Sequence, residues 1–260
     1  MITYKSNEDF MNMKKAGKIV ATIHAELQNI SLPGTKIETL DKKAEEIIKK
    51  SNAVSNFLNY RGFPSYICAS PNDVIVHGIP KNFVIEEGDI LSIDVGCTVN
   101  GFHADAALTY GIGQISSEDQ KLIDVTKKAL YEAIKLVKDG QKLGTIGNKI
   151  EKIGKKNSYG VVREYVGHGI GLEMHEDPQV PNYGIKNKGF KLKKGMAICI
   201  EPMFNLGTAD TKVDADGWTV RTADGKKSAH WEHVIGIMED EVCIFSESVS
   251  YTHLTLPTKA

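Results

Sequence analysis

Several features that would mark a specialised class of protein are scarce or missing in this sequence. Its 260 residues include only four cysteines, too few for a disulfide framework and without a C-x-x-C pair. The 32 basic and 33 acidic residues nearly cancel, so no overall positive field attracts nucleic acid or an anionic membrane. No apolar run approaches the roughly 18 residues of a membrane span, and the first ten residues contain no apolar signal-peptide core. We therefore expect a cytoplasmic protein with free thiols, no membrane segment and no specific nucleic-acid partner.

The elements that the sequence does contain follow an α+β order. A composition of 41% hydrophobic and 25% charged residues is that of a folded globular chain. Capping-box patterns or apolar residues at helical spacing predict four helices, which begin near Ser6, Thr35, Ser116 and Leu143. The third helix is expected to end at Gly140 and the fourth near Lys156. Strand-like runs broken by Gly, Pro and Asn-Gly follow each pair of helices.

This order of helices and strands occurs twice along the chain. A shift of 106 residues matches several helix positions, and a shift of 107 places Asp94 on Glu201 at the ends of two apolar runs. The segment beginning HGIP at His77 likewise corresponds to HEDP at His175. Chance similarity between Lys- and Ile-rich helices would explain the helical matches, but not the matched histidines and acids. We expect one duplicated domain with a site between its halves. The domain spans residues 1–247, with halves of about 1–115 and 116–247.

Two carboxylates are predicted to share one face of a β-hairpin. Asn100-Gly101 is a strong two-residue turn signal, and this turn sets Asp94 opposite Ala107 and Asp105 opposite Gly96. Asp94 and Asp105 then become diagonal neighbours, with Cα atoms roughly 7–8 Å apart. A single strand aspartate would more often point to solvent, but two in one hairpin would repel each other unless a cation lies between them.

Three further residues fit a metal centre with this pair. Glu201 ends an apolar run as Asp94 does, Glu232 interrupts another strand-like stretch, and His168 lies in the glycine-flanked segment GHGIG. Four carboxylates and one imidazole suit two divalent ions such as Mn, Fe or Co, with Zn also suitable. Two such ions promote hydrolysis of a carbonyl compound. The sequence has no H-E-x-x-H, G-x-S-x-G or phosphate-binding loop motif that would indicate another chemistry.

With these residues identified, the sequence resembles the methionine aminopeptidases, in particular the short bacterial type I members of the pita-bread (M24) metallopeptidase family. The motifs IDVG, HADAA, GHGIG, IEPM and WEH carry the resemblance, which runs from about residue 5 to residue 245. It implies a pita-bread fold of two pseudo-symmetric halves, each with paired helices and antiparallel strands. It also implies a metal-ligand set made of Asp94, Asp105, His168, Glu201 and Glu232.

The resemblance further implies how the reaction proceeds. A hydroxide bridging two metal ions attacks the carbonyl that follows an N-terminal methionine, with Glu201 as general base. His175 supports the oxyanion, and His77 contacts the scissile amide. From the residues alone, either of these two histidines could instead be structural.

A substrate pocket and a second cation site also follow from the resemblance. The methionine pocket corresponds to Tyr60, Phe63, Cys68, Met174 and Trp218, which are soft and apolar as a thioether requires. Phe63 and Met174 replace the Tyr and Phe of the family pattern, and both keep the wall apolar. A monovalent ion, Na or K, would bind near Asn72, Val74 and Ser228.

The expected substrates are peptides and nascent chains that begin with methionine, handled by a monomer; a contact with the ribosome is left open. A proline-specific relative would carry an additional N-terminal domain, and a type II enzyme an insertion before the final Glu segment. A non-catalytic binding protein of the same fold predicts missing ligands, yet all five are present. Residues 248–260 extend past the resemblance as a tail of uncertain origin, and the sequence alone does not decide whether they are native.

Overall fold

The computed structural model describes residues 1–247, and the predicted tail lies outside these described residues. The α-helices are α1 (Asn7–Ile30), α2 (Ile37–Lys50), α3 (Ser117–Ile134) and α4 (Leu143–Lys156), with a short 3-10 helix η1 (Tyr60–Gly62). Ser6 is the N-cap of α1 and forms a full capping box. Its hydroxyl accepts a hydrogen bond from the Asp9 amide, and the Asp9 carboxylate accepts one from the Ser6 amide. Four predicted helices are therefore confirmed.

Two predicted helix boundaries are wrong. Thr35 does not cap α2: the N-cap is Lys36, and the Thr35 hydroxyl donates to the Ile30 carbonyl instead. A backbone bridge between Lys36 and Val84 fixes where this helix starts. The third helix ends at Ile134 rather than at Gly140, and the apolar stripe continues outside the helix with Val137, which is buried in the core.

The strands form four sheets, and all the described pairs of strands are antiparallel. The first sheet holds β1 (Val54–Ser55), β2 (Cys68–Pro71), β4 (Ile90–Val99) and β5 (Phe102–Gly111). The largest holds β7 (Gly167–Gly169), β8 (Glu176–Val180), β9 (Ala197–Ile200), β14 (His233–Ile237) and β15 (Val242–Ile244). Two three-stranded sheets contain β6 (Gly160–Val161), β10 (Met203–Asn205) and β13 (Ser228–His230), and β3 (Val74–Val76), β11 (Thr211–Val213) and β12 (Val220–Thr222).

The hairpin register is the predicted one. Asp94 pairs with Ala107, and Gly96 pairs with Asp105 across β4 and β5. Asn100 and Gly101 both adopt the left-handed αL conformation, with φ of 50° and 81°, as a type I′ turn requires. A local sequence signal therefore sets which two carboxylates share a face.

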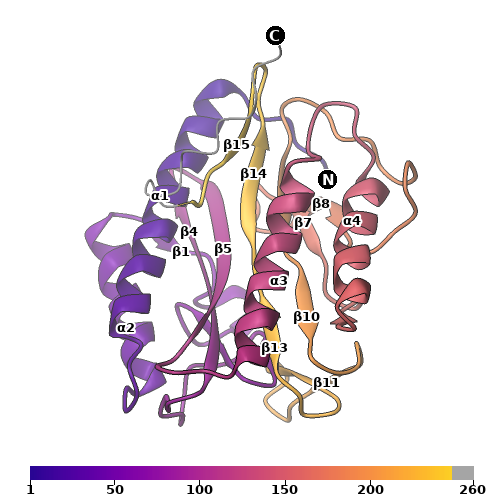
Figure 1. Cartoon of the computed structure of the whole chain (residues 1–260). Helices are drawn as coiled ribbons and strands as arrows, with labels where there is room; N and C mark the ends of the chain where they lie inside the picture. The colour runs from indigo at the N-terminus through magenta and orange to yellow at the C-terminus, as the bar shows by residue number, and fades with distance from the viewer. Residues whose placement is uncertain (248–260) are drawn as a thin grey trace.

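Equivalent backbone contacts recur in the two halves and support the internal repeat. The bridge Lys36–Val84 has its counterpart in Lys142–Lys191, at the predicted shifts of 106 and 107 residues. The hydrogen bond from the Gly34 amide to the Ile85 carbonyl, 2.7 Å, recurs between Gly140 and Leu192 at 2.9 Å. In Figure 1, α1 lies beside the hairpin of β4 and β5 and α2 packs against α1, while α3 lies beside strands of the second half and α4 packs against α3.

The hydrophobic core consists mainly of two clusters, one under each pair of helices. The first includes Phe10, Met13 and Leu40 with the inner side chains of β4 and β5, and the second includes Leu122 and Ile150 with those of β9. No helix among residues 1–247 combines the length and the apolar character that crossing a membrane demands.

Candidate metal centre and substrate pocket

Three carboxylates from both halves of the chain, two of them buried and that of Asp94 half-buried, converge on one point. Asp94 lies on β4, Asp105 on β5, and Glu232 in the two-residue break between β13 and β14. The Glu232 amide donates to the Ala107 carbonyl at 2.8 Å, which ties this break to the hairpin. One carboxylate oxygen of each of the three lies within 4.8 Å of the others.

Each of these three carboxylates has one buried oxygen without a hydrogen-bond partner. Asp94 Oδ1, Asp105 Oδ1 and Glu232 Oε1 are buried and accept no hydrogen bond. Burial raises the pKa of Asp94 and of Glu232 well above their ordinary values, and the neighbouring Asp105 raises both further. Since several adjacent anions out of water are costly, the arrangement fits a cation bound among them.

A second group extends the cluster toward Glu201 and His168. His168 Nδ1 donates to the Gly169 carbonyl at 2.9 Å, so Nε2 is the ring nitrogen left to face the carboxylates. That Nε2 lies 3.8 Å from Glu201 Oε1 and 4.0 Å from Glu232 Oε1. One imidazole nitrogen and two carboxylate oxygens at these distances are atoms that could bind one shared metal ion. The five predicted ligands are thus brought together around one cavity.

The sequence analysis missed two residues of this cluster. His230 Nε2 is buried without a hydrogen-bond partner and lies 3.6 Å from Glu201 Oε2. The Cys199 thiol falls within the 4.8 Å group formed with His168 and Glu232. Each of the two precedes a predicted ligand by two residues, and the period-2 alternation of strand side chains could have indicated both.

The environment of Glu201 differs from that of the other carboxylates. Burial raises the pKa of Glu201, but His230 and His168 outweigh this effect and hold it below its ordinary value. Glu201 therefore stays ionised in surroundings where Asp94 and Glu232 resist ionisation. An ionised carboxylate at the edge of the cluster is suited to accept a proton.

Two further histidines lie on the cavity wall. His77 follows β3 with a φ of 58°, and its ring makes edge contacts with Tyr165 and Trp218. His175 precedes β8, its Nδ1 lies 2.9 Å from the Tyr60 hydroxyl, and its ring centroid is 4.3 Å from that of His168. Burial and the neighbouring His168 lower the pKa of His175 to about 4, so its imidazole is neutral at pH 7.

An apolar pocket opens beside the carboxylates. The cavity has a volume of about 330 Å³, and both the ligand cluster and a small apolar cluster line it. Cys68 on β2 pairs directly with Asp94 on β4, which places the thiol of the pocket next to the acidic group. The apolar cluster contains all five predicted pocket residues, together with two that the sequence analysis missed: Tyr60, Phe63, Cys68, Met174, Trp218, Phe57 and Ile79.

The residues assigned to a monovalent cation are neighbours, but their polar groups already have partners. The Ser228 amide donates to the Asn72 carbonyl at 2.9 Å. The Asn72 side chain donates to Asp89 at 2.8 Å, and Val74 lies two residues further on, at the start of β3. This second cation site remains a prediction.

Comparison with known proteins identifies the family of this chain. The model of metallopeptidase family M24 matches residues 11–239. The chain belongs to metallopeptidase family M24. It is 48% identical over 239 residues to methionine aminopeptidase 1 of Bacillus subtilis, covering 92% of this chain and 96% of that one. With methionine aminopeptidase of Clostridium acetobutylicum it shares 45% over 241 residues, covering 92% and 96%.

Solved structures of the M24 family share this fold. Methionine aminopeptidase from Thermotoga maritima superposes with a TM-score of 0.93 at 40% identity, over 95% of this chain and all of that one. The prolidase from Pyrococcus furiosus superposes with a TM-score of 0.78 at 21% identity, over 95% of this chain and 66% of that one, and this likeness concerns the fold alone. The α+β pita-bread fold predicted from the sequence is therefore confirmed, and the M24 chain is a metal-dependent aminopeptidase.

Proposed function

We propose that this M24 enzyme removes the N-terminal methionine from peptides and nascent proteins by hydrolysis of their first peptide bond. One observation carries the proposal: the apolar pocket lined by Phe63, Cys68 and Met174 and the carboxylate cluster line the same cavity. Its soft, apolar wall suits a thioether side chain. The names of the relatives, all methionine aminopeptidases at 38–48% identity, agree with this substrate.

The metal ligands that we propose are Asp94, Asp105, His168, Glu201 and Glu232. Divalent ions held by this set would polarise the scissile carbonyl and make a water molecule more acidic. We expect two ions, chosen from Co, Mn, Fe and Zn, because oxygen-rich sets with one imidazole accept all of them. We also propose that a Na or K ion binds near Asn72, Val74 and Ser228.

The chain's own groups would handle the protons. Glu201 remains ionised and would accept a proton from the attacking water as general base. When the Tyr60 hydroxyl donates to His175 Nδ1, the neutral imidazole carries its proton on Nε2. That N–H would donate to the oxygen on which negative charge develops. His77, on the same cavity wall, would hydrogen-bond the scissile amide.

We propose that the protein is a monomer in the cytoplasm, and that residues 1–247 form one catalytic domain that acts on nascent chains.

The proposed function can be tested with purified protein that is stripped with a chelator and then given Mn, Co, Fe or Zn in turn, with Met-Gly-Met as substrate. We expect metal-restored release of the first methionine only. No release by folded protein with any of the four metals would contradict the proposed function, as would cleavage of a peptide with proline at its second position in place of Met-Gly-Met.

A further inference from the structure

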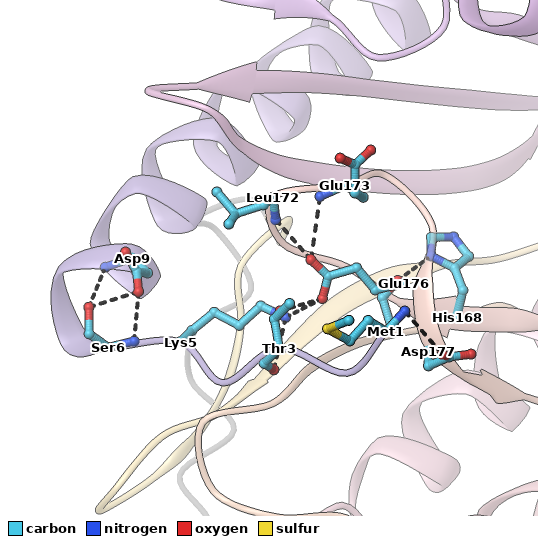
Figure 2. A network of polar contacts seen from close by, with 11 residues as sticks. Met1, Thr3, Lys5, Ser6, Asp9, His168, Leu172, Glu173, Glu176 and Asp177 are labelled. Carbon is cyan, nitrogen blue, oxygen red and sulfur yellow. Dashed lines mark hydrogen bonds and ion pairs between the residues drawn. The ribbon is translucent and has the colours of Figure 1, made fainter.

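The N-terminal strap, residues 1–6, lies against the turn that carries two residues of the cavity. The Lys5 amide donates to the Gly195 carbonyl at 2.7 Å, and the Met1 ammonium pairs with Asp177 at 3.1 Å. Figure 2 shows the strap passing beneath Glu176, with the Lys5 and Thr3 side chains pointing toward its carboxylate. Residues that lie 171 and 173 positions apart in sequence therefore meet here.

Glu176 is the centre of this contact. Lys5 Nζ and the Thr3 hydroxyl donate to its Oε2, with Lys5 at 2.7 Å, while the Leu172 and Glu173 amides, at 2.9 and 3.4 Å, donate to its Oε1. The carboxylate thus joins the strap on one side to the turn at 171–176 on the other (Figure 2). The Lys5 and Glu176 side chains are each only 3% exposed.

The local backbone makes room for this ion pair. A Cβ atom on Gly171 would lie 2.3 Å from Lys5 Cε and 2.8 Å from Glu176 Oε1, so a side chain at 171 would displace the ion pair from this position. Two charges out of water are costly to bury, and a surface ion pair would join the segments without that cost. Burial does, however, restrict the pair to one geometry, which suits a part that must hold its neighbours in place.

The turn at 171–176 contributes two residues, Met174 and His175, to the wall of the cavity. Met174 is 4% exposed and belongs to the apolar pocket cluster. His175 lies between Met174 and Glu176 in sequence, with its ring against His168 and the Tyr60 hydroxyl. Glu176 pairs with Gly169 across β7 and β8, so it also fixes the strand end that follows His175.

We propose that the buried pair of Lys5 and Glu176 is a positioning element, through which the N-terminal strap sets the orientation of His175 and Met174 in the cavity. Lys5 and Glu176 are positioning residues and do not themselves touch the substrate. The consequence for catalysis rests on the proposed function; the consequence for the His175 ring and the turn does not.

The decisive comparison is Lys5→Met against the double variant Lys5→Met/Glu176→Gln. Lys5→Met keeps the apolar stem but leaves a buried carboxylate unpaired, so the turn should shift to reach water. We expect kcat to fall about 10- to 100-fold, the scale of a small misplacement of a reacting group, with metal affinity within about twofold. In the double variant neither charge remains, Gln still accepts from the Leu172 amide, and kcat should recover to within about threefold of wild type.

Two measurements follow the turn without using turnover. The His175 imidazole resonance, assigned with His175→Asn, should shift in Lys5→Met, and hydrogen exchange at the Leu172 and Glu173 amides should accelerate. Both should return toward wild type in the double variant. Thr3→Val, which removes a single donor to Glu176, should give the same changes at smaller size in a protein that folds normally.

Ile150→Val in α4 is the matched control, because Ile150 is fully buried in the other core cluster. It should lower Tm while leaving kcat, the His175 resonance and exchange at the turn unchanged. An unchanged resonance and unchanged exchange in both Lys5→Met and Thr3→Val would overturn the proposal, as would a double variant no better than Lys5→Met. If wild-type protein releases no methionine, the proposed function fails, and the resonance and exchange results still decide whether the strap positions His175.

Discussion

Glu176 and Glu232 are two buried glutamates whose side chains are each 3% exposed, yet their surroundings are opposite. Glu176 accepts from two side chains and two backbone amides, and although burial raises its pKa, these contacts with Lys5 and Thr3 bring it below the ordinary value. Glu232 has an oxygen without any partner, and burial with Asp105 raises its pKa well above the ordinary value.

The difference shows which buried acids serve the scaffold and which serve a ligand. A carboxylate whose hydrogen bonds are supplied by the chain stabilises the fold as it stands. A carboxylate buried beside other acids without donors lowers the stability of the metal-free protein, and a bound cation compensates for that. Burial alone does not distinguish the two cases, whereas the presence of donors does.

The largest expected effect is the loss of activity when Glu201 is replaced. Glu201→Ala removes both a proposed ligand and the proposed base, and should lower kcat/KM by at least about 1,000-fold. Steady-state release of methionine from Met-Gly-Met, with metal content measured by mass spectrometry, checks this. Normal activity of a correctly folded Glu201→Ala enzyme would contradict the mechanism.

On the scaffold side of the comparison, Glu176→Gln should be strongly destabilising. It leaves the Lys5 ammonium buried without a counter-charge, and breaking a buried pair in this way costs about 3–5 kcal/mol. Urea unfolding of the metal-free protein measures the change in free energy. A loss below about 1 kcal/mol would show that the pair contributes little as a pair.

The same Glu-to-Gln substitution at Glu232 should raise, rather than lower, the stability of the metal-free protein. Glu232→Gln removes a buried acid whose Oε1 has no donor, so the chelator-treated protein should melt a few degrees higher than wild type. Turnover should be lost at the same time, because a proposed ligand is gone. Thermal melts of the chelator-treated protein test the first expectation, and methionine release with added Mn tests the second. A lower Tm in chelator would contradict our account of the unpaired carboxylates.

Lowering the pH should remove the stability that ionised Glu176 contributes. The lowered pKa of Glu176 means that its contribution to stability is present above the unfolded value of 4.5 and is lost as pH falls through the folded value. Below about pH 4.5, metal-free wild type should therefore lose stability more steeply than Lys5→Met/Glu176→Gln, which lacks this group. Parallel slopes in urea unfolding between pH 5 and pH 3 would assign the acid sensitivity to other carboxylates.

The smallest effect is expected at an ion pair of the same length on the surface. Lys194 Nζ lies 2.6 Å from Glu239, but the two side chains are 44% and 69% exposed, against 3% for Lys5 and Glu176. Lys194→Met should leave Tm and turnover unchanged within error. A clear loss of Tm here would show that distance, rather than burial, sets the strength of these pairs.

Local signals in the sequence predicted much of the scaffold. The capping box at Ser6 and the Asn100-Gly101 turn act over a few residues, and both are present as expected. Thr35 failed as a cap because the start of α2 is set by the bridge from Lys36 to Val84, which is a tertiary contact. The third helix ends earlier than its apolar stripe, since Val137 is buried by packing outside the helix.

The candidate site was predictable in its residue types but not in all its members. Acids at the ends of apolar strands are anomalies that a single sequence shows, which is why Asp94 and Glu201 were found. His230 and Cys199 look like ordinary strand residues until the neighbouring ligands are placed beside them. Glu176 gave no signal of its own, because its partner is 171 residues away.

The sequence by itself determined the chemistry of this protein: an oxygen-rich ligand set, a hairpin that sets Asp94 and Asp105 on one face, and an apolar pocket lining. These follow from side-chain type and from turn geometry, which are local. Only the tertiary structure decided which buried acids find donors. Lys5 reaches Glu176, while Glu232 lies among other acids without a donor to its Oε1, because solvation and partners depend on segments that meet only when the two halves pack together.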